Sequence, residues 1–204
     1  MRREAMRGGV GFSLVELIVA LAVAMILLAV GLPMFLRAYH VYQLNNAARE
    51  MADILRLARY EAIRLNKPVN CVIKSTGSTP PTTNVWVDSF LVNGNPNNGV
   101  LDPTEKMILL GSGGNLVDAG TVPGTPALLA NAIKSAVPRT PSPTSSTVTF
   151  DARGATTNPT LTVNAFYLSS SVAPEAGYRA VLLMPAGGIQ VWAGDLSGNW
   201  QQLR

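Results

Sequence analysis

The sequence has very little cysteine and histidine, and this shortage excludes several kinds of site. Cys71 is the only cysteine and His40 the only histidine among the 204 residues. A single cysteine cannot form an internal disulfide, and a single histidine cannot build a multi-histidine metal site or a histidine-based catalytic dyad. We therefore interpret Cys71 as a small buried hydrophobic residue and His40 as a surface residue on a helix.

Recognisable catalytic motifs are also missing. The sequence contains no nucleophile elbow, no Walker loop and no CxxC pair. The glycines between Gly111 and Gly114 are not followed by a lysine, so they indicate a turn rather than a phosphate-binding loop. We expect no enzyme, no cofactor and no catalytic residue. The enzyme hypothesis that remains is an anchored hydrolase that uses carboxylates.

Charged residues make up only 14% of the chain, and one long stretch has almost none. No residue from Leu17 to Leu32 is charged, and the apolar residues on both sides extend this run to the roughly 20 residues that span a ~30 Å hydrocarbon core. We predict a transmembrane helix over residues 12–36. Glu16 lies inside this segment, where a carboxylate costs about 2.5 to 3.5 kcal/mol near the bilayer centre, so it needs a compensating partner.

A short basic leader precedes the apolar run. An ordinary secretory signal has its small-residue cleavage site after a shorter apolar run, whereas here the glycines stand before it. A cut after Gly11 would remove residues 1–11, which carry three arginines and one glutamate, and would lower the formal net charge from +4 to +2. The leader arginines predict that this end stays cytoplasmic and that the rest of the chain lies outside. Translation could begin at Met1 or at Met6.

With these features the N-terminus resembles the type IV pilins and type II secretion pseudopilins. In that superfamily a prepilin peptidase cuts between a glycine and a phenylalanine, methylates the new amine and leaves a glutamate at the fifth mature position. Gly11, Phe12 and Glu16 match residue by residue. The resemblance implies cleavage after Gly11, methylation of Phe12 and an assembly role for Glu16; the alternative is an ordinary signal anchor. A methylated amine on Phe12 would be a cation that can pair with Glu16 of a neighbouring subunit.

Beyond the membrane segment the pattern predicts that the helix continues. Gly31 and Pro33 predict a kink rather than an end, because helical periodicity resumes after them. Residues 37–66 form an amphipathic half that ends near Leu65, with Asn66 as a left-handed cap. The predicted buried stripe is Leu44, Ala47, Ala48, Met51, Ile54, Leu55, Ala58 and Ala62.

Residues 67–204 are predicted to form a β-rich domain, because short runs of Val, Ile, Phe, Trp and Thr alternate with turn residues. The fold class is therefore α+β, with the long N-terminal helix packed on an antiparallel sheet or on two sheets. Residues 111–146 are rich in Gly, Pro, Ser and Thr and are predicted to form a long surface loop with a short helix over residues 127–137. Trp200, in the C-terminal tail, is expected to dock on the domain. The predicted strands are Val69 to Lys74, Val85 to Val92, Met107 to Leu110, Thr147 to Asp151, Leu161 to Leu168, Arg179 to Met184 and Ile189 to Ala193.

Three segments resemble the H-type minor pseudopilins, the GspH/FimT-like family. They are LRLARYEAIRLNKPV at residues 55–69, FDARG at residues 150–154, and the closing hairpin from Arg179 to Ile189. The resemblance implies a minor pseudopilin or minor pilin, which is a structural subunit of a type II secretion pseudopilus or a type IV pilus. The implied partners are the prepilin peptidase, other pilin subunits, the inner-membrane assembly platform and membrane lipid. The implied location is the inner membrane, with the C-terminal domain outside the cytoplasm.

Two further ligands have weaker support. Some members of the GspH/FimT-like family resemble DNA receptors, which use basic residues around a Gly-Arg pair in the last hairpin. In this sequence the matching position is Gly188, and it is followed by Ile189 and Gln190 instead of a basic residue. DNA capture during uptake therefore stays an alternative that is not favoured. The second candidate is a calcium site with oxygen ligands at near-alternate positions, although the spacing is not that of an EF-hand and a polar loop is favoured. The candidate calcium ligands are Asn93, Asn95, Asn97, Asp102 and Glu105.

Overall fold

The computed structural model describes residues 13–76, 82–89, 98–111, 113–124, 142, 145–157 and 163–203. By compactness the chain divides into two units, residues 1–38 and residues 39–204. The division falls within a helix, close to the predicted boundary at Leu36 between the membrane segment and the amphipathic half. The second unit contains every strand among the described residues.

Helix α1 runs from Leu14 to Leu65. It is continuous through Gly31 and Pro33, so the helix does not end there, and the kink at this point stays a prediction. At its C-terminal end Asn66 adopts φ 49°, and the Lys67 amide donates to the Ala62 carbonyl at 3.2 Å. The predicted left-handed cap is therefore confirmed.

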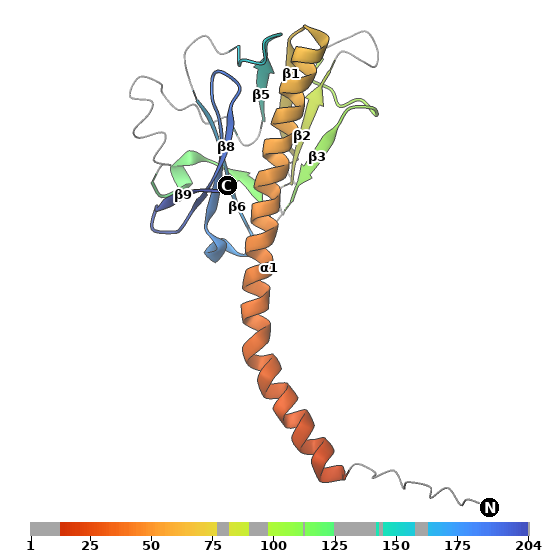
Figure 1. The fold of residues 1–204 in the computed structure, drawn as a ribbon, viewed down its shortest axis with the longest axis vertical. Coiled ribbons are helices and arrows are strands. Elements are labelled where there is room, and N and C mark those ends of the chain that lie inside the picture. The colour runs from red at the N-terminus through yellow and green to blue at the C-terminus, as the bar shows by residue number, and fades with distance from the viewer. Residues whose placement is uncertain are drawn as a thin grey trace, which may run out of the picture. The chain divides into compact units, whose positions relative to one another are not determined.

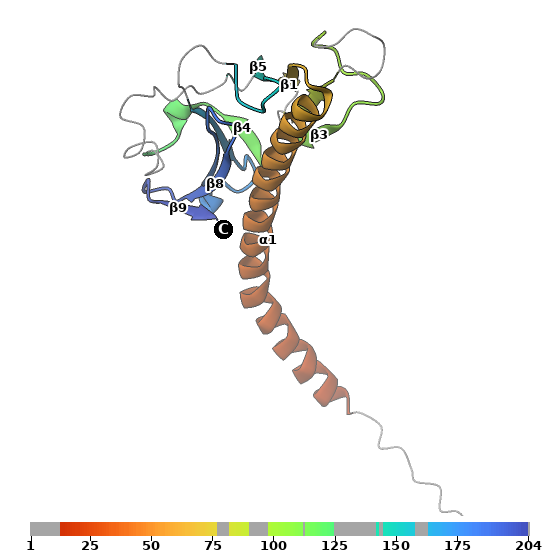
Figure 2. The same cartoon turned by 45° about the horizontal axis from the view of Figure 1, so that its top comes forward.

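The strands of the second unit form two antiparallel sheets (Figure 1). Sheet 1 has the order β3-β2-β1-β5 and sheet 2 has the order β4-β6-β7-β8-β9. Figure 2 shows β8 and β9 of sheet 2 on the opposite side of α1 from β3 of sheet 1. The strands of sheet 1 are β1 (Val69–Thr76), β2 (Thr82–Asp88), β3 (Met107–Leu110) and β5 (Ser145–Phe150). Those of sheet 2 are β4 (Asn115–Val117), β6 (Asn164–Ser169), β7 (Tyr178–Leu183), β8 (Ile189–Gly194) and β9 (Trp200–Leu203).

The amphipathic half of α1 fills the space between the sheets. Every residue of the predicted stripe is buried, and the stripe shares one apolar core with both sheets. Met51 and Leu55 belong to this core together with Ile73 of sheet 1 and with Phe166 and Val181 of sheet 2. The predicted α+β fold, a long helix packed on antiparallel sheets, is confirmed.

Sheet 2 is buried on both faces, which the sequence did not predict. Because side chains alternate along a strand, Phe166 and Val181 join the core around α1, whereas Tyr167 and Leu182 point into a second core on the opposite face. The two edge strands of sheet 2 add Val117 of β4 and Trp200 of β9 to this second core. Ala119 and Val122, which lie outside the sheet, also pack there.

The predicted loop over residues 111–146 is therefore wrong in its described parts. Strand β4 lies inside this range and pairs with β6, and the 3-10 helix η1 (Ala119–Thr121) follows it. Val122 is 8% exposed because it covers the outer face of sheet 2. The short helix predicted over residues 127–137 lies outside the described residues.

The remaining corrections concern strand ends and the tail. Strand β2 begins at Thr82 and ends at Asp88, so the run predicted from Val85 to Val92 was placed too late. Strand β6 begins at Asn164 rather than Leu161. Trp200 docks as predicted, since its indole Nε1 donates to the Pro123 carbonyl at 3.3 Å. In addition, residues 200–203 form β9, a strand that the sequence did not predict.

The single cysteine, Cys71, and the single histidine, His40, differ in their surroundings. Cys71 is fully buried in β1, and burial raises the pKa of its thiol to about 12. The interpretation of Cys71 as a buried hydrophobic residue is confirmed. His40 is half-buried beside Tyr39, with ring centroids 6.0 Å apart, and its Nδ1 atom is buried without a hydrogen bond. His40 lies on α1 and keeps part of its surface exposed, which agrees with the interpretation of His40 as a surface residue on a helix.

Candidate functional site

The first candidate site is the apolar part of α1. Every side chain from Ser13 to Tyr39 is exposed, although most of them are large and apolar. By length and composition this part of the helix is able to cross a membrane. Side chains of this kind are stable only when lipid or other protein covers them. Gly11 and Phe12, the predicted cleavage and methylation residues, lie outside the described residues.

Glu16 is located in the first turn of α1. There the positive end of the helix dipole favours a carboxylate. Its neighbours Leu14 and Leu17 are 75% and 58% exposed, and Glu16 has no hydrogen bond or ion pair with any residue that the structure describes. A partner for this carboxylate must therefore come from another molecule or from the residues before Ser13.

The second candidate site is formed where the three segments that resemble the GspH/FimT-like family meet. Arg59 comes from the helix end, Gly154 from the FDARG turn and Gly187 from the closing hairpin. Arg59 donates from Nη1 to the Gly187 carbonyl at 3.1 Å. A side chain at Gly154 would meet Arg59 Nε at 2.9 Å. We call these three residues the motif junction.

Both glycines of the motif junction have a backbone that other residues rarely adopt. Gly154 has φ 77° and Gly187 has φ 79°. The FDARG turn is held by Asp151, whose Oδ1 accepts hydrogen bonds from the amides of Arg153 at 2.9 Å and Ala155 at 2.8 Å. In the hairpin the Gly187 amide donates to the Met184 carbonyl at 2.8 Å. The motif junction therefore fixes the helix end against two turns that are far apart in sequence.

Arg179 in β7 is a buried cation for which the sequence predicted no role beyond the start of a strand. It is 5% exposed, and its Nε donates to Asn45 Oδ1 on α1 at 2.6 Å while Nη1 donates to the Tyr178 carbonyl at 2.7 Å. Burial lowers the pKa of this guanidinium below its ordinary value. A sequence signal was available, because alternation along β7 places Arg179 on the same face as Val181, which packs on the helix. Arg179 thus ties sheet 2 to α1.

The closing hairpin carries no basic residue at the position that the DNA-receptor resemblance would need. Gly188 occupies this position, and a side chain there would have no atom closer than 3.7 Å. Gln190 is engaged by Trp192, whose indole Nε1 donates to Gln190 Oε1 at 3.2 Å. At Gly188 and Gln190 the hairpin therefore offers no cationic side chain to a phosphate.

The described part of the candidate calcium loop uses its carboxylates to hold the backbone. Glu105 accepts hydrogen bonds from the amides of Ser89 and Asp102, each at 3.0 Å, and Asp88 Oδ2 accepts from the Gly99 amide at 2.7 Å. Partial burial raises the pKa of Glu105, while the two amides oppose that rise. Asn93, Asn95 and Asn97 lie outside the described residues, and the described residues contain no group of three metal-ligating side chains.

Calcium is therefore expected to have little effect on stability. Adding a chelator to the purified chain should shift the melting temperature by less than about 2 °C, which corresponds to at most ~1 kcal/mol for a domain of this size. Differential scanning calorimetry with and without added calcium measures this shift. A large fall in melting temperature on chelation, reversed by added calcium, would identify the loop as a true cation site. The Asp102→Asn variant should then no longer respond to calcium.

Comparison with known proteins places part of the chain, from the amphipathic half of α1 to the turn that follows β7, in one family. Residues 47–187 match the family described as Type II transport protein GspH. The type IV minor pilin FimU of Pseudomonas aeruginosa has a solved structure that aligns with 80% of this chain and 94% of its own, at 17% identity and a TM-score of 0.41. A search of curated proteins gave no match. Because the family match spans more than half of the chain, this protein belongs to the GspH family, described as Type II transport protein GspH.

Proposed function

We propose that the chain is a minor pseudopilin or minor pilin that joins a type II secretion pseudopilus or a type IV pilus through its N-terminal helix. The observation that carries this proposal is the exposed apolar part of α1, from Leu14 to Tyr39, in a chain of the GspH family. In the membrane before assembly, lipid covers these side chains. In the filament, the helices of neighbouring subunits take the place of lipid.

The pairing of opposite charges supports assembly through this helix. Cleavage after Gly11 would give Phe12 a methylated amine, which is a cation at neutral pH. Glu16 has no partner among the described residues of its own chain, so the amine of a neighbouring subunit fits it. The same carboxylate that is costly in lipid would then specify the position of one subunit against the next.

The same proposal assigns the partners and the location. The prepilin peptidase would process the chain, the inner-membrane assembly platform would receive it, and other subunits and lipid would surround its helix. The leader arginines favour a cytoplasmic N-terminus. The C-terminal unit would then lie outside the cytoplasm, attached to the inner membrane or carried on the filament.

Intact mass measurement of the protein extracted from membranes tests the processing step. The mature chain is expected to begin at Phe12 and to carry one methyl group on its amine. A Gly11→Val variant is the matched control and should retain residues 1–11 while inserting normally. A mature chain that begins beyond Leu32 would contradict the proposal, because the helix would then be a discarded signal.

DNA binding is expected to be weak, so the DNA-uptake alternative is not favoured. The full chain in detergent micelles should bind double-stranded DNA with a dissociation constant weaker than about 1 µM and with a small salt slope, because few phosphates would be neutralised. Fluorescence anisotropy at several salt concentrations measures both quantities. Gly188→Arg, which restores the basic residue at an open position, should strengthen binding. Tight binding by the unmodified chain at physiological salt would favour the alternative.

A further inference from the structure

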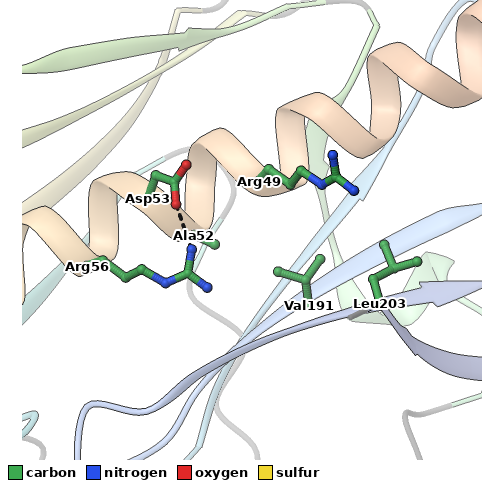
Figure 3. Close-up of a pocket in the computed structure, with 6 residues that line it drawn as sticks. All are labelled: Arg49, Ala52, Asp53, Arg56, Val191 and Leu203. Carbon is green, nitrogen blue, oxygen red and sulfur yellow. Dashed lines mark hydrogen bonds and ion pairs between the residues drawn. The ribbon is translucent and has the colours of Figure 1, made fainter.

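A groove lies between α1 and the β8 and β9 strands of sheet 2, within the second unit. It holds about 250 Å³ and is lined by Arg49, Ala52, Asp53, Arg56, Val191 and Leu203. Figure 3 shows the helix residues on one side of the groove and Val191 and Leu203 on the other. Ala52 and Val191 are buried and Leu203 is half-buried, whereas the two arginines are exposed. The groove thus combines an apolar floor with a polar rim.

The rim keeps one unmatched positive charge. Arg56 donates to Asp53 Oδ1 at 2.6 Å, so these two charges satisfy each other. Arg49 makes no hydrogen bond and no ion pair with any residue that the structure describes. A guanidinium in this state is suited to a carboxylate, which it can bind through two parallel hydrogen bonds.

The groove runs beside a sheet edge. Strand β9 is the last strand of sheet 2 and, among the described strands, pairs only with β8, with Leu203 opposite Val191. Its other edge presents amide and carbonyl groups that no described strand pairs. Extended peptides add to edges of this kind, with main-chain hydrogen bonds for affinity and side-chain pockets for specificity.

We propose that the groove and the free edge of β9 bind an extended acidic segment of a neighbouring subunit. The segment pairs with β9, places an apolar side chain against Val191 and Leu203, and sets a carboxylate on Arg49. The identity of the partner as a neighbouring subunit rests on the proposed function, whereas the recognition chemistry does not. A nucleic acid fits less well, because the rim offers a single unpaired guanidinium to a backbone of many phosphates and the lining has no aromatic side chain on which a base could stack.

Peptide binding to the full chain in detergent micelles tests this proposal. The probe is a short fluorescent peptide that alternates valine with glutamate, and the readout is fluorescence anisotropy. Arg49→Glu is expected to weaken binding by at least about tenfold and to favour a matched peptide that carries lysine in place of glutamate. Lys74→Glu is the control, because it makes the same charge change at an exposed position of β1 in sheet 1.

Three results would overturn the proposal. Equal binding of the glutamate peptide to the parent chain and to Arg49→Glu would show that the guanidinium is not its anchor. Equal binding of a peptide that is N-methylated on alternate amides would exclude strand addition to β9. Full displacement of the peptide by double-stranded DNA would identify a nucleic-acid surface instead. The assay requires neither processing nor a filament, so its failure is separate from a failure of the proposed function.

Discussion

Glu16→Leu is expected to be processed and inserted into the membrane like the parent chain, yet to be nearly absent from filaments. Leucine makes the segment more apolar, so insertion should not suffer. In the filament, however, the methylated amine of a neighbouring Phe12 would lose its carboxylate. An unpaired buried charge typically costs about 3 to 5 kcal/mol, which lowers incorporation by a factor on the order of a hundred or more.

The measurement compares two amounts of the same variant. One is the cleaved, membrane-inserted subunit, and the other is the subunit that copurifies with sheared filaments or with partner subunits. Glu16→Gln keeps the shape of the side chain and removes its charge, so it should behave like Glu16→Leu. Glu50→Gln is the matched control, because Glu50 is an acidic residue of α1 in the second unit, where Asn46 donates to it at 2.8 Å. Filaments that accept Glu16→Leu as readily as the parent chain would refute the pairing.

Gly187→Ala is expected to destabilise the second unit by about 2 to 5 kcal/mol, the sum of a strained backbone and an overpacked contact. The backbone at Gly187 has φ 79°, which is unfavourable for alanine. An added Cβ would also clash with the Gly154 carbonyl oxygen and would lie 2.7 Å from Arg59 Nε. Because Gly154 is itself part of a tight turn, neither side of the motif junction can move aside without cost.

The neighbouring residue offers the control for this variant. Gly188 does not have a positive φ, and the nearest atom to an added Cβ is Met184 Cγ at 3.7 Å. Gly188→Ala should therefore change stability by no more than about 0.5 kcal/mol. Urea unfolding of the full chain in micelles, followed by tryptophan fluorescence, measures both variants. Similar losses in the two variants would show that the hairpin as a whole, and not the motif junction, sets the effect.

The sequence predicted the elements whose burial depends on a long repeated pattern. Side chains such as Leu44 and Met51 recur at helical spacing over several turns, so the buried face of α1 could be read directly. Strand β3 is an uninterrupted apolar run and was placed with its true ends. In these segments local preference and tertiary packing agree.

The missed elements are short segments whose structure depends on partners distant in sequence. Strand β4 has only three residues, within a Gly- and Pro-rich stretch. Its Asn115 is buried, and the cost of burying the amide is offset by the hydrogen bond that Oδ1 accepts from the Thr83 hydroxyl at 2.7 Å. Strand β9 contains two glutamines and is recognisable only by its pairing with β8. The residue pattern of one short segment gives no information about pairing with a strand that is distant in sequence.

The candidate sites divide in the same way. Glu16 could be singled out from the sequence because a carboxylate in an apolar run is conspicuous on its own, and its role in assembly stays a prediction. The contacts of Arg59 could not, since they arise where three segments converge in space. The free guanidinium of Arg49 was likewise hidden, because Asp53 is spaced to form an ion pair with either Arg49 or Arg56. In the structure Asp53 pairs with Arg56.

The burial of the Cys71 thiol determines how the protein would respond to an oxidising compartment. With a pKa of about 12 the thiol stays protonated at neutral pH, and no part of it reaches solvent. Thiolates, not thiols, attack disulfides and oxidants. Burial therefore protects Cys71 of a folded copy from oxidants, and a disulfide between two copies requires β1 to leave its sheet. If the second unit folds outside the cytoplasm, as proposed, it needs no thiol oxidase or disulfide isomerase, and a disulfide-linked dimer would mark chains that have failed to fold.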